Sequence, residues 1–266
     1  MKNRLISVIM IFVMVFALIP ATAFAKTYGG EFNSNTKDPN GNPYTCVWIF
    51  DEASKTLYIE GVGVLPEFST GNFPWETYRL KIENVVIEEG ITTIGKRGFA
   101  SHAFLKKISI PNSVTGIQMR AFEYCRSLET ITIPGTVSNI QDQAFLECTA
   151  LKKVVFEDGI DSLGCYMFGN CKALEDVYVY GMNTQISRMR SNTDDGVWFR
   201  GCNFDILTAH CYEGSDAQDY FENDIYTITN WSNDKVTGAE KQQSHAWKEN
   251  SMKAGGYTLN VEYIAE

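Results

Sequence analysis

The chain has 266 residues, 44% of them apolar and 21% charged, so it can form a hydrophobic core and is not a disordered tail. Its 23 Lys and Arg against 32 Asp and Glu give a formal net charge of −9. This acidic balance argues against a nucleic-acid-binding protein, because phosphates require a basic surface. A single long apolar run argues against a protein with several membrane spans.

The apolar run lies at the N-terminus and has the features of an export signal. Lys2 and Arg4 precede an apolar stretch from Leu5 to Ile19, and small residues around Ala25 form a cleavage site. The stretch is shorter than the roughly 20 residues that a spanning helix needs. Residues 1–25 are therefore predicted to be a signal peptide, with no membrane span after its cleavage.

Two segments of different composition follow the predicted signal. Lys26 to Asn42 is polar and rich in Gly and Asn, which predicts a mobile leader. Tyr44 to Ile59 is predicted to form two strands joined by a turn at Asp51–Lys55.

A period of 23 residues then runs through the centre of the chain without a gap. The pattern is L-x-x-I-x-I-P-x-x-V-x-x-I-x-x-x-A-F-x-x-C-x-x. Positions 4 and 6 alternate with a mostly polar position 5, which predicts a half-buried strand, and positions 10 to 13 predict a second short strand or turn. Four units begin at Ile82, Leu105, Leu128 and Leu151, and a fifth opens at Leu174 before it departs from the register.

Two columns of the repeat predict parallel stacking. Position 18 is always Phe, and because one unit leaves its apolar side chains open on both flanks, only a stack of units is stable. Position 2 alternates in sign, so opposite charges meet if neighbouring strands are parallel and in register. The position 2 residues are Glu83, Lys106, Glu129, Lys152 and Glu175.

This repeat resembles the BspA-type leucine-rich repeats of bacterial cell-surface and secreted proteins. The close match covers Ile82 to Ala173; Trp48 to Gly63 with Pro74-Trp75 resembles the N-terminal capping segment of that family, and Ala209 to Ala217 its closing segment. The resemblance implies an α/β fold that is mostly β. It is a leucine-rich-repeat right-handed solenoid with a curved parallel sheet, an N-terminal β cap and a short C-terminal cap.

The C-terminal part is predicted from local signals. Ser215 is placed as the N-cap of a short helix from Asp216 to Glu222, whose residues Ala217, Tyr220 and Phe221 point inward. Ser232 to Ser244 is linker-like, and Tyr257, Leu259, Val261 and Tyr263 alternate as one strand that must pack on the end of the solenoid. The predicted division is signal peptide 1–25, leader and β cap 26–81, four regular repeats and a fifth with an insertion 82–204, C-terminal cap 205–230, and linker with terminal strand 231–266.

Seven cysteines are an odd number for an exported protein. Cys125, Cys148 and Cys171 share position 21, where the first unit has His102. A metal ladder and disulfides between repeats are possible readings of this column. We favour a small inward-facing filler, because one ligand per layer does not build a tetrahedral site. A Cys202–Cys211 disulfide that staples the C-terminal cap stays open.

Recognisable catalytic motifs are missing from the sequence. The three histidines are scattered, and no G-x-S-x-G, H-E-x-x-H or phosphate-binding Gly loop occurs. The acidic pairs at Glu88-Glu89 and Asp194-Asp195 fall in predicted turns, and Asp38 to Asn42 departs from the calcium-loop pattern. We therefore predict no enzyme activity, no metal and no cofactor.

Two surfaces remain as candidate binding sites. Positions 3 and 5 of the strands are predicted to face outward, which is the kind of face that solenoids use for binding. Trp198 to Cys202 repeats the A-F-x-x-C pattern after eight extra residues, so Met182 to Val197 is predicted to be an inserted loop. The alternatives are a bare solvated face and a functionless insertion. The candidates are Lys107, Ser109, Thr130, Thr132, Lys153, Val155, Asp176 and Tyr178 on the strands, and Arg188 and Arg190 in the loop.

The prediction for function is a secreted or cell-surface interaction or adhesion module without catalysis. The resemblance implies that its partners are extracellular proteins or glycans, host matrix included, with no nucleic acid. The alternative is a structural accessory or spacer of the cell envelope that docks another chain through its ends.

Overall fold

The computed structural model describes residues 27–37, 41–69, 71–187, 198–203, 205–221, 251–254 and 257–264. The predicted signal peptide and the predicted linker lie outside these residues. The strands are β1 (Thr27–Lys37), β2 (Pro43–Asp51), β3 (Thr56–Glu60), β4 (Gly63–Val64), β5 (Asn84–Ile87), β6 (Ile91–Ile94), β7 (Lys107–Ser109), β8 (Gly116–Ile117), β9 (Thr130–Ile133), β10 (Asn139–Ile140), β11 (Lys153–Phe156), β12 (Ser162–Leu163), β13 (Asp176–Val179), β14 (Gln185–Ile186), β15 (Thr208–Cys211), β16 (Ser251–Ala254) and β17 (Tyr257–Tyr263).

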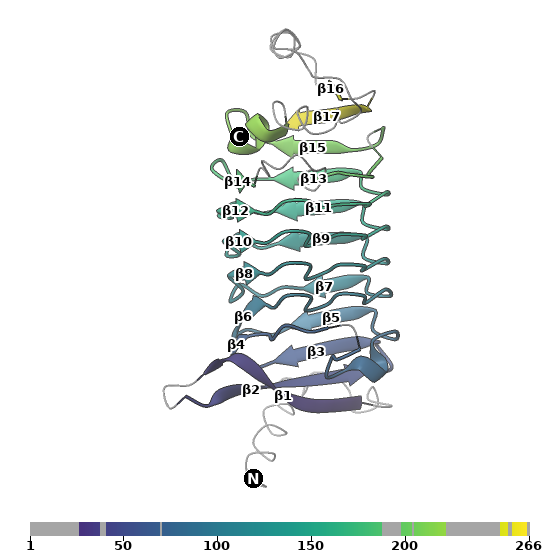
Figure 1. Cartoon of the computed structure of the whole chain (residues 1–266), viewed down its shortest axis with the longest axis vertical. Helices are drawn as coiled ribbons and strands as arrows, with labels where there is room; N and C mark the ends of the chain where they lie inside the picture. Colours follow the sequence, from purple (N-terminus) through teal and green to yellow (C-terminus); the bar gives the residue numbers. More distant parts are fainter. Residues whose placement is uncertain are drawn as a thin grey trace.

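The strands lie above one another like rungs, and each repeat contributes one longer and one shorter strand (Figure 1). The longer strands form two sheets in the orders β1-β2-β3-β5-β7 and β9-β11-β13-β15-β17-β16, and the shorter strands form one sheet from β4 to β14. Within the repeats all pairs are parallel and in register, with Thr130 opposite Lys153 and Lys153 opposite Asp176. The predicted leucine-rich-repeat solenoid, mostly β with parallel sheets, is therefore confirmed.

The N-terminal end differs from the sequence prediction. Thr27–Lys37, predicted as part of a mobile leader, forms strand β1 and pairs antiparallel with β2, so that prediction is wrong for these residues. The rings of Tyr28 and Phe32 pack on the core, and Gly30 lies so close to the Trp48 indole that a Cβ atom would be 2.8 Å from Nε1. Tyr28, Gly30 and Phe32 alternate on the inward side of this strand, and the many Gly and Asn residues of the segment obscured that alternation in the sequence. The two strands predicted between Tyr44 and Ile59 are confirmed as β2 and β3.

The core is organised around a column of phenylalanine rings. Its members are fully buried, neighbouring centroids are 5.4 to 5.8 Å apart, and neighbouring planes are within 10°. Trp75 closes the column at 6.2 Å from the first ring, and Phe221 closes it at 6.2 Å from the last. Each ring is thus covered on both faces by a neighbour, as the stacking argument requires. The column consists of Phe99, Phe122, Phe145, Phe168 and Phe199.

The predicted charge ladder is present in part. Lys106 Nζ lies 2.7 Å from a carboxylate oxygen of Glu83, and Lys152 Nζ lies 3.4 Å from one of Glu129. The backbone supports the same register, since the Glu175 amide donates to the Lys152 carbonyl. Lys106 also holds the pKa of Glu83 below its ordinary value. These pairs are exposed, so they favour the register more than they add to stability.

Two positions in each of the four regular units adopt a left-handed backbone conformation that the sequence did not indicate. Their amide groups donate to carbonyls of the next unit, as Arg97 N does to Met119 O at 3.1 Å and Ser101 N to Glu123 O at 2.7 Å. These hydrogen bonds therefore link neighbouring units in the turns, outside the long and short strands. The φ angles are 51 to 62° at Arg97, Ser101, Arg120, Tyr124, Gln143, Glu147, Tyr166 and Asn170.

The fifth unit keeps the register for longer than predicted. Gln185–Ile186 forms β14 and pairs with β12, so Met182 to Ser187 belongs to the regular repeat and the insertion does not begin at Met182. Phe199 then stacks on Phe168, which confirms that Trp198 to Cys202 resumes the pattern. The extra residues fall between these two segments, outside the described residues.

The C-terminal end continues the sheet. β15 pairs parallel with β13, and the helix α2 (Asp216–Asp219) begins as predicted, with Ser215 Oγ accepting from Gln218 N at 3.1 Å. The predicted terminal strand is confirmed as β17, parallel to β15, with Leu259 and Val261 buried. Tyr263 is 45% exposed and so does not point inward. The antiparallel partner β16 was not predicted. No helix among the described residues has the length and apolar character to cross a membrane.

Removal of one ring from the phenylalanine column tests the stacking argument. The Phe145→Ala variant should lose about 3 to 5 kcal/mol of unfolding free energy, because it leaves a buried cavity between the rings of Phe122 and Phe168. The Phe145→Leu variant keeps most of the volume and should lose less than about 1.5 kcal/mol. Urea unfolding of both variants measures this; equal losses would contradict a tightly packed column.

The left-handed turns are tested at Ser101, where φ is 61°. Ser101→Gly should raise the unfolding free energy by about 0.5 kcal/mol, because glycine adopts this conformation without strain. Ser101→Val should lower it by about 2 kcal/mol, since a β-branched residue is most strained there. Thermal unfolding with Ser101→Ala as the intermediate control checks the order; a Gly variant that melts below the Val variant would contradict it.

Candidate functional site

The cysteine column at position 21 proves to be structural filler. Cys125, Cys148 and Cys171 are fully buried, free thiols. Each Sγ lies 3.1 to 3.2 Å from the carbonyl oxygen of the column phenylalanine in the preceding unit, and Cys202 repeats this contact with Phe168. Burial raises the pKa of these thiols, so they are neutral donors rather than nucleophiles. In the described part of the chain no disulfide joins Cys202 to Cys211, so the staple that the sequence left open is not formed.

His102 occupies the same column in the first unit and is held from both ring nitrogens. Trp75 Nε1 donates to its Nε2 at 2.9 Å, so the proton is on Nδ1, which donates to the Phe99 carbonyl at 2.9 Å. Burial lowers its pKa to about 4, against the raising effect of the Ala100 and Phe99 carbonyls. The residue therefore caps the cysteine column as a neutral imidazole. No group of metal-ligating side chains is found in the described part of the chain.

The predicted binding strip faces outward, as expected. Lys107, Thr130, Lys153 and Asp176 occupy position 3, and Ser109, Thr132, Val155 and Tyr178 occupy position 5 of successive long strands. The structure places the Lys153 ammonium over the Tyr178 ring, and Asp176 lies opposite Lys153 in the register of the neighbouring strands. Lys107 and Ser109 lie on β7, which belongs to the other long sheet. Arg188 and Arg190 lie outside the described residues. Binding by any of these side chains remains a prediction.

A cluster of aromatic and charged side chains covers the C-terminal end of this strip, and we name it the tyrosine face. It spans four neighbouring rungs, β11, β13, β15 and β17 (Figure 1). Its members are Lys153, Asp176, Tyr178, Tyr180, His210, Tyr212 and Glu262.

Tyr178 lies at the centre of the tyrosine face. Its ring is parallel to the His210 imidazole, with centroids 4.0 Å apart and planes within 3°. The Lys153 ammonium is 4.5 Å from its centroid. Because β11 and β15 flank β13 on opposite sides, the ammonium and the imidazole cover opposite faces of the ring. Burial raises the pKa of the Tyr178 hydroxyl and the Asp176 carboxylate raises it further, so the hydroxyl stays a neutral donor.

The other members of the tyrosine face surround this stack. His210 Nε2 lies 2.7 Å from Asp176 Oδ1, and its Nδ1 lies 3.4 Å from Glu262 Oε2 on the terminal strand. Tyr180 lies 6.1 Å from Tyr178, and Tyr212 meets Tyr180 at 6.2 Å with the planes at 67°. The face thus presents hydroxyls, exposed carboxylates and an ammonium on a rigid sheet.

Sequence reasoning found three members of the tyrosine face and missed four. Tyr180 is at position 7, where two regular units have Pro, and this change was the available signal. His210 and Tyr212 were assigned to a closing segment, and only the pairing of β15 with β13 shows that they share columns with Tyr178 and Tyr180. Glu262 enters from a strand 52 residues further along the chain, a placement that no local pattern indicates.

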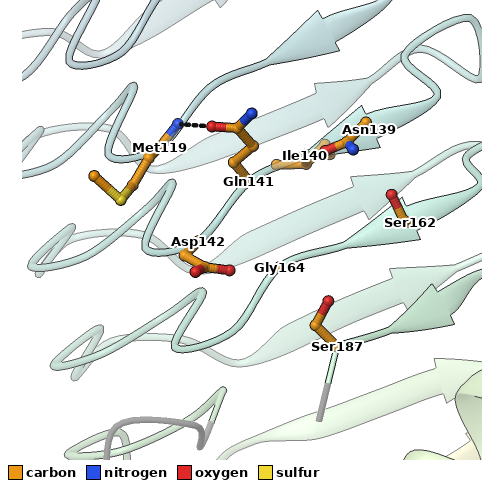
Figure 2. Close-up of a pocket in the computed structure, with 8 residues that line it drawn as sticks. All are labelled: Met119, Asn139, Ile140, Gln141, Asp142, Ser162, Gly164 and Ser187. Carbon is orange, nitrogen blue, oxygen red and sulfur yellow. Dashed lines mark hydrogen bonds between the residues drawn. The ribbon is translucent and has the colours of Figure 1, made fainter. Parts of the chain in front are cut away.

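A shallow hollow of about 240 Å³ lies elsewhere, along the short-strand sheet (Figure 2). It opens where Gly164 replaces glutamines of the same column, such as Gln141, whose amide oxygen accepts from Met119 N at 3.0 Å (Figure 2). A Cβ atom at Gly164 would lie 2.4 Å from Asp142 N, so no side chain fits. The volume is below that of most small-molecule sites, and the hollow reflects an irregular repeat. Its lining is Met119, Asn139, Ile140, Gln141, Asp142, Ser162, Gly164 and Ser187.

The parallel rungs, the 23-residue period and the buried apolar columns together define a leucine-rich repeat protein. Residues 76–191 match the family model described as BspA type Leucine rich repeat region (6 copies). The repeat region of this chain is therefore similar to the BspA-type leucine-rich repeats. Proteins with repeats of this type are typically found on the bacterial cell surface, and such repeats are typical of protein-interaction modules.

One solved structure supports the fold, and two others are less similar. A leucine-rich repeat protein from Eubacterium ventriosum is 19% identical, with a TM-score of 0.51 over 70% of this chain and 45% of that one. The chain thus spans less than half of that protein. A leucine rich cell surface protein from Faecalibacterium prausnitzii is 15% identical with a TM-score of 0.35, over 68% of this chain and 71% of that one. A leucine rich repeat protein from T. pallidum is 19% identical with a TM-score of 0.33, over 61% and 84%. No curated protein matches the sequence.

The buried His102 makes stability depend on pH. Its pKa is about 4 in the folded state and near 6.5 when unfolded, so the unfolded chain binds the extra proton between these values. The His102 contribution is therefore complete above about pH 6.5 and is lost as the pH falls toward 4, by about 3 kcal/mol in total. Urea unfolding from pH 4 to 7 should show this slope, and His102→Gln should flatten it. An unchanged slope in the variant would contradict the assignment.

Proposed function

We propose that the chain is a secreted or cell-surface interaction module, without catalysis, that binds an extracellular protein or glycan through the tyrosine face. The observation that carries this proposal is that seven aromatic and charged side chains from four neighbouring strand positions lie together on one face of the solenoid. Tyrosine is enriched at binding interfaces, because its ring supplies a large contact area at low entropic cost and its hydroxyl supplies a hydrogen bond.

The state of the reactive side chains supports a role without catalysis. The column thiols are buried with raised pKa values, and His102 uses both ring nitrogens for hydrogen bonds in the core. His210 lies between the carboxylates of Asp176 and Glu262, with its ring stacked on Tyr178. In the described part of the chain these groups serve packing and the organisation of the face.

The architecture supports binding of a large ligand rather than a small one. The tyrosine face lies on an open sheet, with Lys153 exposed and Glu262 61% exposed, and the hollow beside the short strands is small. Rigid strands fix the positions of these side chains before binding, which lowers the entropic cost of association. The predicted signal peptide and the typical cell-surface location of proteins with these repeats support an extracellular partner.

An array of purified matrix proteins, mucus glycoproteins and glycans tests the proposal, with the chain from Lys26 onward as the probe. Specific capture should fall at least about tenfold in the Tyr180→Ala, Tyr212→Ala double variant, because both rings belong to the face. The matched control is Asn112→Ala, Thr115→Ala, which changes two exposed residues beside the short strand β8, in a different sheet from the tyrosine face.

A second arm examines the inserted segment. Arg188→Ala, Arg190→Ala should leave capture unchanged if the tyrosine face is the binding site. Capture that is lost in this variant and kept in the tyrosine variant would move the site to the insertion. No capture of any array member would contradict the proposed function.

A further inference from the structure

The charge distribution changes along the solenoid. Residues 82–172 carry nine Lys and Arg and ten Asp and Glu, which nearly balance. Residues 173–187, 205–221 and 257–264, which contain β13, β15 and β17, carry seven carboxylates and no Lys or Arg. With Arg200 and Lys253 of the neighbouring described segments included, this end still has a net negative charge, which attracts cations. The seven are Glu175, Asp176, Asp205, Glu213, Asp216, Asp219 and Glu262.

The tyrosine face already holds one cation. The Lys153 ammonium reaches from β11 across to β13 and lies 4.5 Å from the Tyr178 centroid, within the range of a cation–π interaction. Lys153 is the last basic residue on the long strands before the acidic end. This contact within the chain demonstrates which charge the rings of this face accept.

A second pair of rings offers the same chemistry to a partner. Tyr180 and Tyr212 are half-buried, and their planes meet at 67° with centroids 6.2 Å apart. Asp176 is 37% exposed and Glu262 is 61% exposed, so both carboxylates are accessible to a ligand. Tilted aromatic faces beside accessible carboxylates suit an ammonium or guanidinium group.

We propose that the partner of the tyrosine face is a basic polypeptide segment. It places a Lys or Arg side chain against Tyr180 and Tyr212, and pairs another with Asp176 or Glu262. The inference rests on the proposed function and names the chemical class of its partner. A neutral glycan can donate hydrogen bonds to these carboxylates but gains no Coulombic attraction from their charge, and an acidic glycan is repelled by it.

A pair of matched peptides tests the charge requirement. One is a Gly-Ser peptide of about twelve residues with Arg at every third position, and the other has citrulline in place of each Arg, which removes the charge and keeps the shape. Binding to the chain from Lys26 onward is measured by fluorescence anisotropy. The Arg peptide should bind at least about tenfold more tightly at roughly 50 mM salt, and several-fold more weakly at roughly 300 mM.

Two double variants locate the interaction. Tyr180→Ala, Tyr212→Ala removes the rings, and Asp176→Asn, Glu262→Gln removes the charge with little change in shape. Each should lower the affinity for the Arg peptide at least about fivefold, whereas Asn112→Ala, Thr115→Ala beside β8 should leave it unchanged. Thermal unfolding confirms that the variants are folded, and the carboxylate pair keeps the test valid if the tyrosine pair is unstable.

The outcomes separate this inference from the proposed function. Equal affinity for the two peptides, or affinity unchanged in both variants, overturns the inference. A different outcome is that the array partners are neutral or acidic proteins or glycans whose binding does not depend on salt and is lost in the Tyr180→Ala, Tyr212→Ala variant. That result would support the proposed function and overturn the inference that the partner is basic. Array partners that are basic and lost in both variants support the two together.

Discussion

The structure depends on one constraint, the contact of each residue with its equivalent in the next unit. The five column phenylalanines lie face to face at 5.4 to 5.8 Å, and this requires the strands of successive units to stay in register. Neither flank of a unit is buried without a neighbour. Trp75 and Phe221 end the column, and the β1–β2 pair and the β17–β16 pair cover the two ends of the long sheets.

The same constraint decides what the inward polar groups do. A thiol at position 21 is sandwiched between layers and has one carbonyl within reach, so the cysteines become neutral donors to Phe99, Phe122, Phe145 and Phe168. His102 fills the same column at the N-terminal end, where the Trp75 indole replaces the missing preceding unit. The left-handed turns serve the layers likewise, because they direct amides toward carbonyls of the next unit.

Outward positions are free of this constraint, and function can therefore vary there. Along positions 3, 5 and 7 the face changes from hydroxyls and Pro at β9 to tyrosines and carboxylates at β13 and β15. The strand β17, which covers the end of the solenoid, also brings Glu262 to His210, so that cap and face are one structure. The interaction surface proposed for this chain is thus a product of how the solenoid ends.

The sequence by itself determined the period, the strands, the inward columns, the short capped helix and the outward direction of Lys153, Asp176 and Tyr178, because contacts between equivalent residues leave a repeating signal. It misassigned Thr27–Lys37, began the insertion too early and did not find β16. Only the tertiary structure brought His210, Tyr212 and Glu262 into the tyrosine face. Those residues lie after the repeat ends, where pairing depends on which sheet edge is open, and no local pattern records that.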